Sequence, residues 1–252
     1  MKYRLKALGW HFLASTCLLL TIIGGLYLGW YRWPGWYLAG MLKVLPITVG
    51  VDAALGPLMT FIIASPSKPL RSLARDIAVI AVVQLVALVY GSMTLWQARP
   101  LYYAYSVNEI SIIQGMDLDS AQIALGQQSN PDLAPHWYSL PRWIYAPLPD
   151  DAKISDAIVR SALTGGNDVT DMPRYYQPWR NGLPDLRKQL QKIDDSRFFS
   201  IKDKTVLKQR MAERGIPVDT PATIPVTGHG TPLLAVFDLH TMEMRALLSA
   251  KP

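Results

Sequence analysis

The stretch from Ala7 to Tyr31 carries no Lys, Arg, Asp or Glu across 25 residues. A helix needs roughly 20 apolar residues to cross the hydrocarbon core of a bilayer. No small-residue cleavage site follows the stretch, which runs instead into an aromatic cluster between Trp30 and Tyr37. Trp and Tyr are enriched where a membrane meets water. We therefore predict a membrane-crossing helix that stays as an anchor, not a cleaved signal peptide.

Two further apolar runs follow in the same part of the chain. Residues 44–64 are interrupted by one acid, Asp52, and residues 77–98 carry no charge at all. The sequence therefore predicts a transmembrane domain over residues 1–98, with three helices at about 8–31, 40–64 and 77–97. The expected fold class is membrane α-helical, followed by a separate domain over residues 99–252.

The distribution of charged residues indicates how the chain is oriented in the membrane and which partners are not expected. Basic residues cluster before the first run and between the second and third, at Lys2, Arg4, Lys6, Lys68, Arg71 and Arg75. Because loops rich in Lys and Arg stay in the cytoplasm, the N-terminus is expected there and residues 99–252 in the periplasm of a bacterial inner-membrane protein. Residues 1–97 hold eight basic and two acidic side chains, which accounts for the whole net charge of +6. The excess of basic residues thus indicates the orientation of the chain in the membrane, and nucleic acid is not an expected partner.

Asp52 is the costliest residue of the predicted spans, since a carboxylate at mid-span costs about 2.5–3.5 kcal/mol on insertion scales. Thr48, Asp52, Gly56 and Thr60 recur every four residues and would share one helix face. Three roles are considered for this stripe. A proton relay is the least favoured, because no second acid lies within the predicted spans, and two other interpretations stay open. The stripe is an internal contact, with Asp52 bonded to Gln84 or Tyr90 of the third run or to Thr16 or Thr21 of the first, or it receives a helix from another protein. The candidate partner-binding residues are Thr48, Asp52, Gly56, Thr60, Gln84 and Tyr90.

The remaining polar residues of the first run are expected to line a helix interface. His11 and Cys17 have no second ligand in the predicted membrane domain, so a metal site is not expected there. Because Cys17 is the only cysteine, the chain forms no intramolecular disulfide.

Residues 99–252 are predicted to form an α+β domain with a small mixed or antiparallel sheet. Alternating apolar residues predict strands at 101–107, 110–114, 233–237 and 243–248. Residues 127–149 show no clear periodicity and are either a loop or contain an irregular strand such as 143–146. Helices are expected at about 120–125, 151–163, 183–195 and 202–214. The aromatic cluster of residues 175–179 is either packed against the sheet or a binding surface.

The sequence contains no pattern for a phosphate-binding loop, a zinc protease, a serine hydrolase or a dinucleotide site. His136, His229 and His240 are isolated from one another in the sequence, and a lone histidine in a loop is usually a surface residue. We therefore expect no catalytic, cofactor-binding or metal-binding residues, and no enzyme activity.

The chain resembles the TfpX/TfpZ family of type IV pilin accessory proteins. The resemblance is strongest at residues 50–57, Gly-Val-Asp-Ala-Ala-Leu-Gly-Pro, and continues through residues 76–91, 97–100, 161–166 and 173–176. It implies a non-enzymatic helper of a type IV pilin, which waits in the inner membrane as an apolar helix topped by a soluble head outside. The helper would bind the pilin and assist its stability or assembly into pili, with the lipid bilayer as its other partner. The alternative is a membrane enzyme that modifies pilin by glycosyl or lipid transfer. A sensor is disfavoured because no cytoplasmic domain is predicted.

Overall fold

The computed structural model describes residues 2–50, 56–63 and 69–251, and its chain divides into two compact units. One, the helical unit, comprises Met1–Arg32 and Met41–Ala98, and the other, the sheet unit, comprises Trp33–Gly40 and Arg99–Pro252. The predicted boundary near residue 98 coincides with one junction between the units. The short segment Trp33–Gly40 differs from the prediction, because it packs with the sheet unit and not with residues 1–98.

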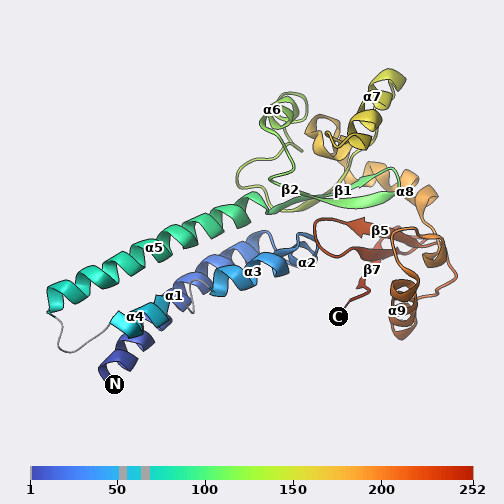
Figure 1. Cartoon of the computed structure of the whole chain (residues 1–252). Coiled ribbons are helices and arrows are strands. Elements are labelled where there is room, and N and C mark those ends of the chain that lie inside the picture. Colours follow the sequence, from blue (N-terminus) through green and yellow to red (C-terminus); the bar gives the residue numbers. More distant parts are fainter. Residues whose placement is uncertain (1, 51–55, 64–68, 252) are drawn as a thin grey trace. The chain divides into compact units, whose positions relative to one another are not determined.

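The helical unit contains α1 (Lys2–Gly29), α3 (Met41–Val49), α4 (Gly56–Ile63) and α5 (Leu70–Gln97) (Figure 1). Within the described residues, two helical stretches are long and apolar enough to cross a membrane, Arg4–Gly29 and Arg71–Gln97. They correspond to the first and third predicted spans. In the second apolar run the described residues form two shorter helices, α3 with Pro46 inside it and α4, so a single spanning helix is not seen there. Asp52 lies outside the described residues.

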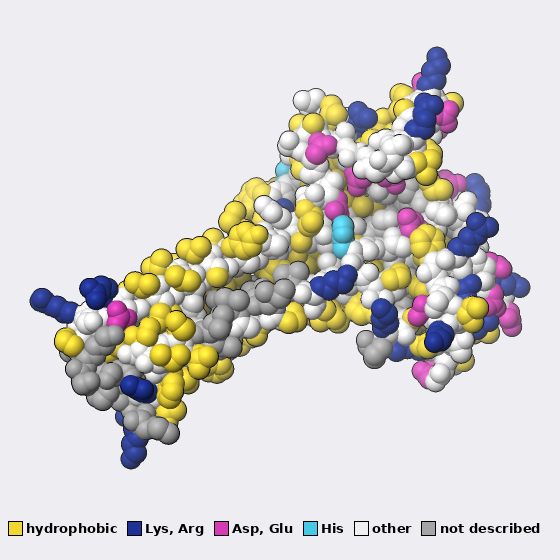
Figure 2. All heavy atoms as spheres, viewed as in Figure 1, with side chains coloured by type: hydrophobic (Ala, Val, Ile, Leu, Met, Phe, Trp, Pro, Cys, Tyr) yellow, Lys and Arg dark blue, Asp and Glu magenta, His cyan; other side chains and the backbone are white. Residues whose placement is uncertain are grey.

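The surface of the helical unit is largely apolar. On α5, Val79, Val82, Val83 and Val86 are each 60–65% exposed. Figure 2 shows hydrophobic side chains along the visible face of these helices, and Lys and Arg gathered at the end that carries the N-terminus. Continuous exposed apolar surface marks contact with a membrane or with another protein.

The sheet unit is built on a mixed sheet, which is one of the two predicted alternatives, the other being an antiparallel sheet. Within the described residues the sheet has seven strands in the order β4-β3-β1-β2-β5-β6-β7. The strands are β1 (Pro100–Ser106), β2 (Glu109–Gln114), β3 (Arg142–Tyr145), β4 (Gln177–Pro178), β5 (Thr223–Thr227), β6 (Leu233–Phe237) and β7 (Met244–Ser249). The β1–β3 and β2–β5 pairs are parallel, and the other neighbours are antiparallel.

Helices and short 3-10 turns connect the strands. The α-helices are α6 (Ser120–Ser129), α7 (Ala152–Leu163), α8 (Leu183–Gln189) and α9 (Ile201–Glu213). The 3-10 turns are η2 (Val169–Asp171), η3 (Pro173–Tyr175), η4 (Trp179–Gly182) and η5 (Ile193–Asp195). Helix α7 begins as predicted, because the Asp151 carboxylate accepts hydrogen bonds from the amides of Lys153 and Ile154.

Both faces of the sheet are covered, because successive side chains of a strand point to opposite faces. On one face Tyr103, Tyr105 and Phe237 pack against α8 and against Trp179, so the aromatic cluster of residues 175–179 contributes to the core. On the other face α9 covers β6 and β7 through Leu207 and Met211. The β1–β3 part of that second face is covered by Leu118, Tyr176 and residues near them.

The segment Trp33–Gly40, which contains α2 (Gly35–Leu38), is part of the first of these cores. Leu38 is fully buried, and the Tyr37 hydroxyl is hydrogen-bonded to that of Ser249. The amide of Gly230 donates to the carbonyl oxygen of Leu38 at 2.6 Å. A Cβ at Gly230 would overlap the carbonyl of Tyr37, so only glycine permits this approach. The sheet unit therefore needs residues that lie before α3 in the chain.

We predict that Leu38→Ala destabilises the sheet unit. A soluble chain that joins residues 33–40 to 99–252 through a Gly/Ser linker should unfold cooperatively in urea. Leu38→Ala should lower its free energy of unfolding by about 2–5 kcal/mol, because the substitution leaves a cavity in a core. The control is Leu140→Ala, at a leucine that is 58% exposed. Equal effects of the two substitutions on the urea midpoint would contradict the assignment of Leu38 to the core.

Candidate functional site

A chain of polar side chains joins three helices of the helical unit. The Nε2 atom of His11 on α1 lies 2.6 Å from Oε1 of Gln84 on α5. The Nδ1 atom of the same ring lies 2.6 Å from the hydroxyl oxygen of Thr60 on α4. An amide oxygen only accepts, so the Nε2–H group donates to Gln84, and Nδ1 is hydrogen-bonded to the Thr60 hydroxyl. Every polar atom of the imidazole is therefore satisfied.

Gly56 makes this arrangement possible. It lies on α4 one turn before Thr60, and both residues are buried. A Cβ at position 56 would overlap the side-chain amide of Gln84. Small residues let helices approach closely, and here the space left by glycine holds the amide that bonds to His11.

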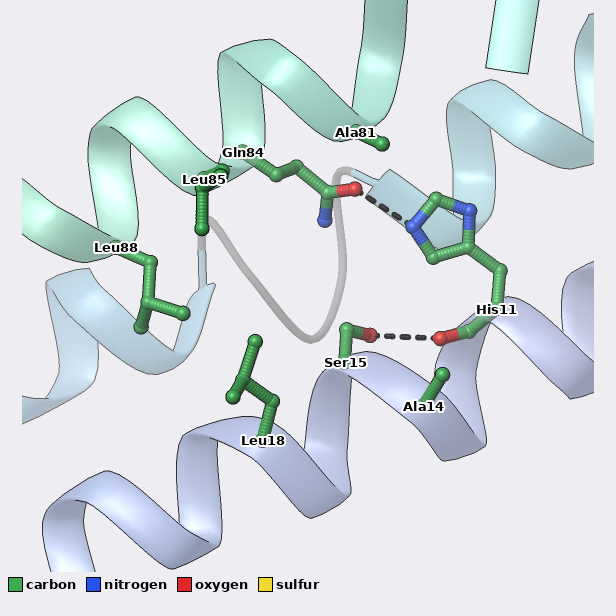
Figure 3. Close-up of a pocket in the computed structure, with 8 residues that line it drawn as sticks. All are labelled: His11, Ala14, Ser15, Leu18, Ala81, Gln84, Leu85 and Leu88. Atoms are coloured by element: carbon green, nitrogen blue, oxygen red, sulfur yellow. Dashed lines mark hydrogen bonds between the residues drawn. The ribbon is translucent and has the colours of Figure 1, made fainter. Parts of the chain in front are cut away.

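A groove between α1 and α5 begins at this polar chain (Figure 3). Its first hollow, of about 290 Å³, has His11, Ser15 and Gln84 at one end. Its second hollow, of about 390 Å³, continues to Leu26, Met93 and Trp96. The two hollows share the side chains Leu18, Leu85 and Leu88. The helical unit thus has one continuous groove that is polar at one end and apolar along the rest.

The structure brings together three of the six predicted partner-binding residues. Gly56, Thr60 and Gln84 meet one another around His11 and face the chain's own helices. Tyr90 is 75% exposed. Thr48 lies on α3, and Asp52 lies outside the described residues.

His11 is the member of this cluster that sequence analysis did not select. It was expected only to line a helix interface, and its two bonds reach 49 and 73 residues along the chain. The sequence did hold a signal for this contact. His11 and Gln84 are polar side chains in separate apolar runs, and polar side chains within a membrane usually pair with one another.

In the sheet unit the histidines lie apart from one another. The His229 ring bonds to Asp117 at 3.1 Å, and the His136 ring stacks on Tyr138. Among the described residues no group of three or more His, Cys, Asp or Glu side chains could hold a metal ion.

Asp171 is a carboxylic acid of the sheet unit whose pKa is clearly raised. Burial raises the pKa of its carboxyl to about 6, and the negative charges of Asp117 and Asp168 act in the same direction. A hydrogen bond from the amide of Asp168, at 2.9 Å, opposes this shift in part.

The chain is similar to the fimbrial assembly protein of serogroup E1 from Dichelobacter nodosus, with 28% identity over 194 residues, or 76% of this chain and 73% of the relative. The serogroup I protein of the same organism is 27% identical over 194 residues, with the same coverage. The protein of serogroups C1 and C2 is 32% identical over 113 residues, which are 45% of this chain and 86% of the relative. The chain belongs to the family of fimbrial assembly proteins.

These fimbrial assembly proteins agree with the broader part of the resemblance seen in the sequence. The narrower assignment to TfpX/TfpZ stays a prediction. The chain matches no family model, and no solved structure is significantly similar to it.

We predict that Gly56→Ala destabilises the helical unit by displacing Gln84 from His11. Overpacking typically costs about 1–3 kcal/mol, which thermal unfolding of the purified chain in detergent would measure. The matched control is Gly24→Ala on α1, where a Cβ would meet no atom within 4 Å. In a Gln84→Ala background, which removes the amide, Gly56→Ala should cost little. Independent, additive effects of Gly56→Ala and Gln84→Ala would contradict this account.

A second prediction concerns pH. Because the pKa of Asp171 is about 6 in the folded unit and about 3.9 in an unfolded chain, the folded state holds the proton more tightly between these values. The free energy of unfolding contributed by this group should therefore be highest below about pH 4 and fall as the pH rises through 6. Urea unfolding of the linked soluble chain from pH 4 to 7 should show a flatter profile for Asp171→Asn. An unchanged profile would contradict the shift.

Proposed function

We propose that this chain is an inner-membrane accessory protein that assists a type IV pilin in its stability or its assembly into pili. The observation that carries the proposal is its membership of the family of fimbrial assembly proteins. The long apolar helices and the groove between them support a mode of action in which the chain binds the pilin while the pilin is still in the membrane.

The proposed topology has three crossings. Helices α1 and α5 provide two, and α3 with α4 would provide the third on either side of residues 51–55. Lys2, Arg4 and Lys6 precede the first crossing, and Arg71 and Arg75 lie at the start of α5. Under the positive-inside bias these ends are cytoplasmic, and the sheet unit is then periplasmic.

The proposed occupant of the groove is the apolar helix of the pilin. Ala14, Ser15 and Ala81 are small residues at the polar end of the groove, and small residues favour close helix contact in membranes. The side chains of Leu18, Leu85 and Leu88 continue the contact surface. Gly56 and Thr60 contact the chain's own helices. We therefore propose that the groove, and not these two residues, contacts the pilin. Asp52 stays a candidate contact, to be tested by Asp52→Ala.

We further propose that the chain acts without catalysis. The motifs of common enzyme classes are missing from the sequence, and binding alone accounts for a helper of assembly. The alternative, a membrane enzyme that transfers a sugar or lipid to pilin, makes a different prediction. It requires that the mass of pilin change when the gene for this chain is deleted, whereas a binding helper leaves the mass unchanged.

Site-specific photocrosslinking in cells tests the proposed contact. A photoreactive amino acid at Leu85 or Met93 should crosslink to pilin, because these residues line the groove and are 54% and 57% exposed. Val83 and Val86 are the controls, since they lie on the same helix, are 64% and 65% exposed, and do not line either hollow. Equal crosslinking from all four positions, or none to pilin, would contradict the proposal.

A further inference from the structure

A loop of the sheet unit exposes three large apolar side chains within four residues. Between α6 and β3, Trp137 is 74% exposed, Tyr138 59% and Leu140 58%. Clustered exposed apolar side chains mark sites of interaction, because a solitary soluble domain normally packs such residues inside.

This loop is held in place by hydrogen bonds, so the exposure is a feature of an ordered loop. The amide of His136 donates to the Ser139 hydroxyl at 2.8 Å, and the amide of Ser139 donates back to the His136 carbonyl at 3.0 Å. The guanidinium of Arg142 donates to the carbonyl oxygens of Asp132 and Ala134 at the base of the loop. The Trp137 and Tyr138 rings contact each other edge to face, with centroids 5.5 Å apart. The loop therefore presents its aromatic side chains on a fixed base.

Chain connectivity places this loop beside a junction with the helical unit. The Arg99 guanidinium lies 3.4 Å from the carbonyl oxygen of Trp137, to which it donates. Arg99 is the second residue after the end of α5 at Gln97. The carbonyl of Arg99 also accepts from the amide of Gly115, whose neighbour Met116 is 61% exposed.

One other exposed aromatic residue of the sheet unit lies next to a junction. In the described part of the sheet unit the exposed Trp, Tyr and Phe side chains are Trp33, Trp137, Tyr138 and Phe198. Trp33 directly follows Arg32, the last residue before another junction. Of these four residues, Trp33 lies at a junction, and Trp137 and Tyr138 lie in the loop that is bonded to Arg99 beside another junction. Phe198 lies between η5 and α9, away from the junctions.

We propose that Trp137, Tyr138 and Leu140, together with Met116, insert into the headgroup layer of the membrane leaflet next to the sheet unit. Trp and Tyr favour this layer because their rings are apolar while their N–H and O–H groups bond to water and headgroups. The observations favour lipid over a protein partner, because the loop is hydrogen-bonded to Arg99, two residues after α5 ends. The inference rests on the proposal that α1 and α5 cross the membrane together. It gives the sheet unit a second attachment, which limits how the unit rotates on its connections.

Fluorescence quenching by lipids tests this insertion in the full-length chain. With Cys17→Ser as background, single cysteines are introduced by Tyr138→Cys, Leu140→Cys, Leu163→Cys, Ile201→Cys or Leu20→Cys and labelled with bimane. The proteins are reconstituted into phosphatidylethanolamine–phosphatidylglycerol vesicles that carry a spin label at the headgroup or near the acyl-chain end. Leu163 and Ile201 are matched controls, since they are 81% and 85% exposed in the same unit. Leu20 lies within α1 and reports on the crossing itself.

The headgroup label should quench bimane at positions 138 and 140 at least about threefold more than at 163 and 201, because an interfacial loop lies at headgroup depth. The acyl-chain label should quench bimane at position 20. Equal quenching at 138, 140, 163 and 201, with position 20 quenched, overturns the loop insertion and leaves the topology standing. An unquenched position 20 overturns the membrane crossing and the insertion with it. Protection of position 138 by pilin or by a second copy of the chain, without lipid quenching, also overturns the insertion.

Discussion

The packing of Leu38 into the core of the sheet unit is the contact on which the organisation of this chain depends. It means that the sheet unit is built from two separate pieces of sequence, with the helices α3, α4 and α5 between them. The chain therefore passes between its two units at three places, after Arg32, after Gly40 and after Ala98. Gly40, with a φ of +73°, turns the chain at the second of these places, where a residue with a Cβ would be strained. The folding of the sheet unit is consequently linked to the positions at which α1 ends and α3 begins.

The helical unit has internal organisation beyond that of a tether. A histidine between apolar helices is costly unless its ring nitrogens are bonded, and Thr60 and Gln84 meet this requirement from two other helices. These bonds fix α4 against α1 and α5, while the rest of the α1–α5 contact leaves an apolar groove. A fixed groove with one polar end is suited to holding another apolar helix. This is the physical basis for the proposal that the chain contacts pilin directly.

Features set by nearby residues could be predicted from the sequence, and features set by distant residues could not. The β1–β2 and β6–β7 pairs follow from alternating apolar residues, and the start of α7 follows from its Asp151 cap. Strand β5 was missed, since Pro225 within it weakens the strand pattern. The predicted helix at 183–195 ends early because Gln191 bridges to Thr223. The contacts of Leu38 and of His11 join parts of the chain that no local pattern relates.

The most direct test of the central claim is to fill the groove and count surface pili. Ala81→Trp places a large side chain in the groove, and Val82→Trp places the same side chain at an exposed position of α5 outside both hollows. With both variants present at wild-type levels in the membrane, the account predicts that Ala81→Trp loses surface pili and Val82→Trp keeps them. Normal piliation in the Ala81→Trp strain would contradict the claim that this groove holds the pilin.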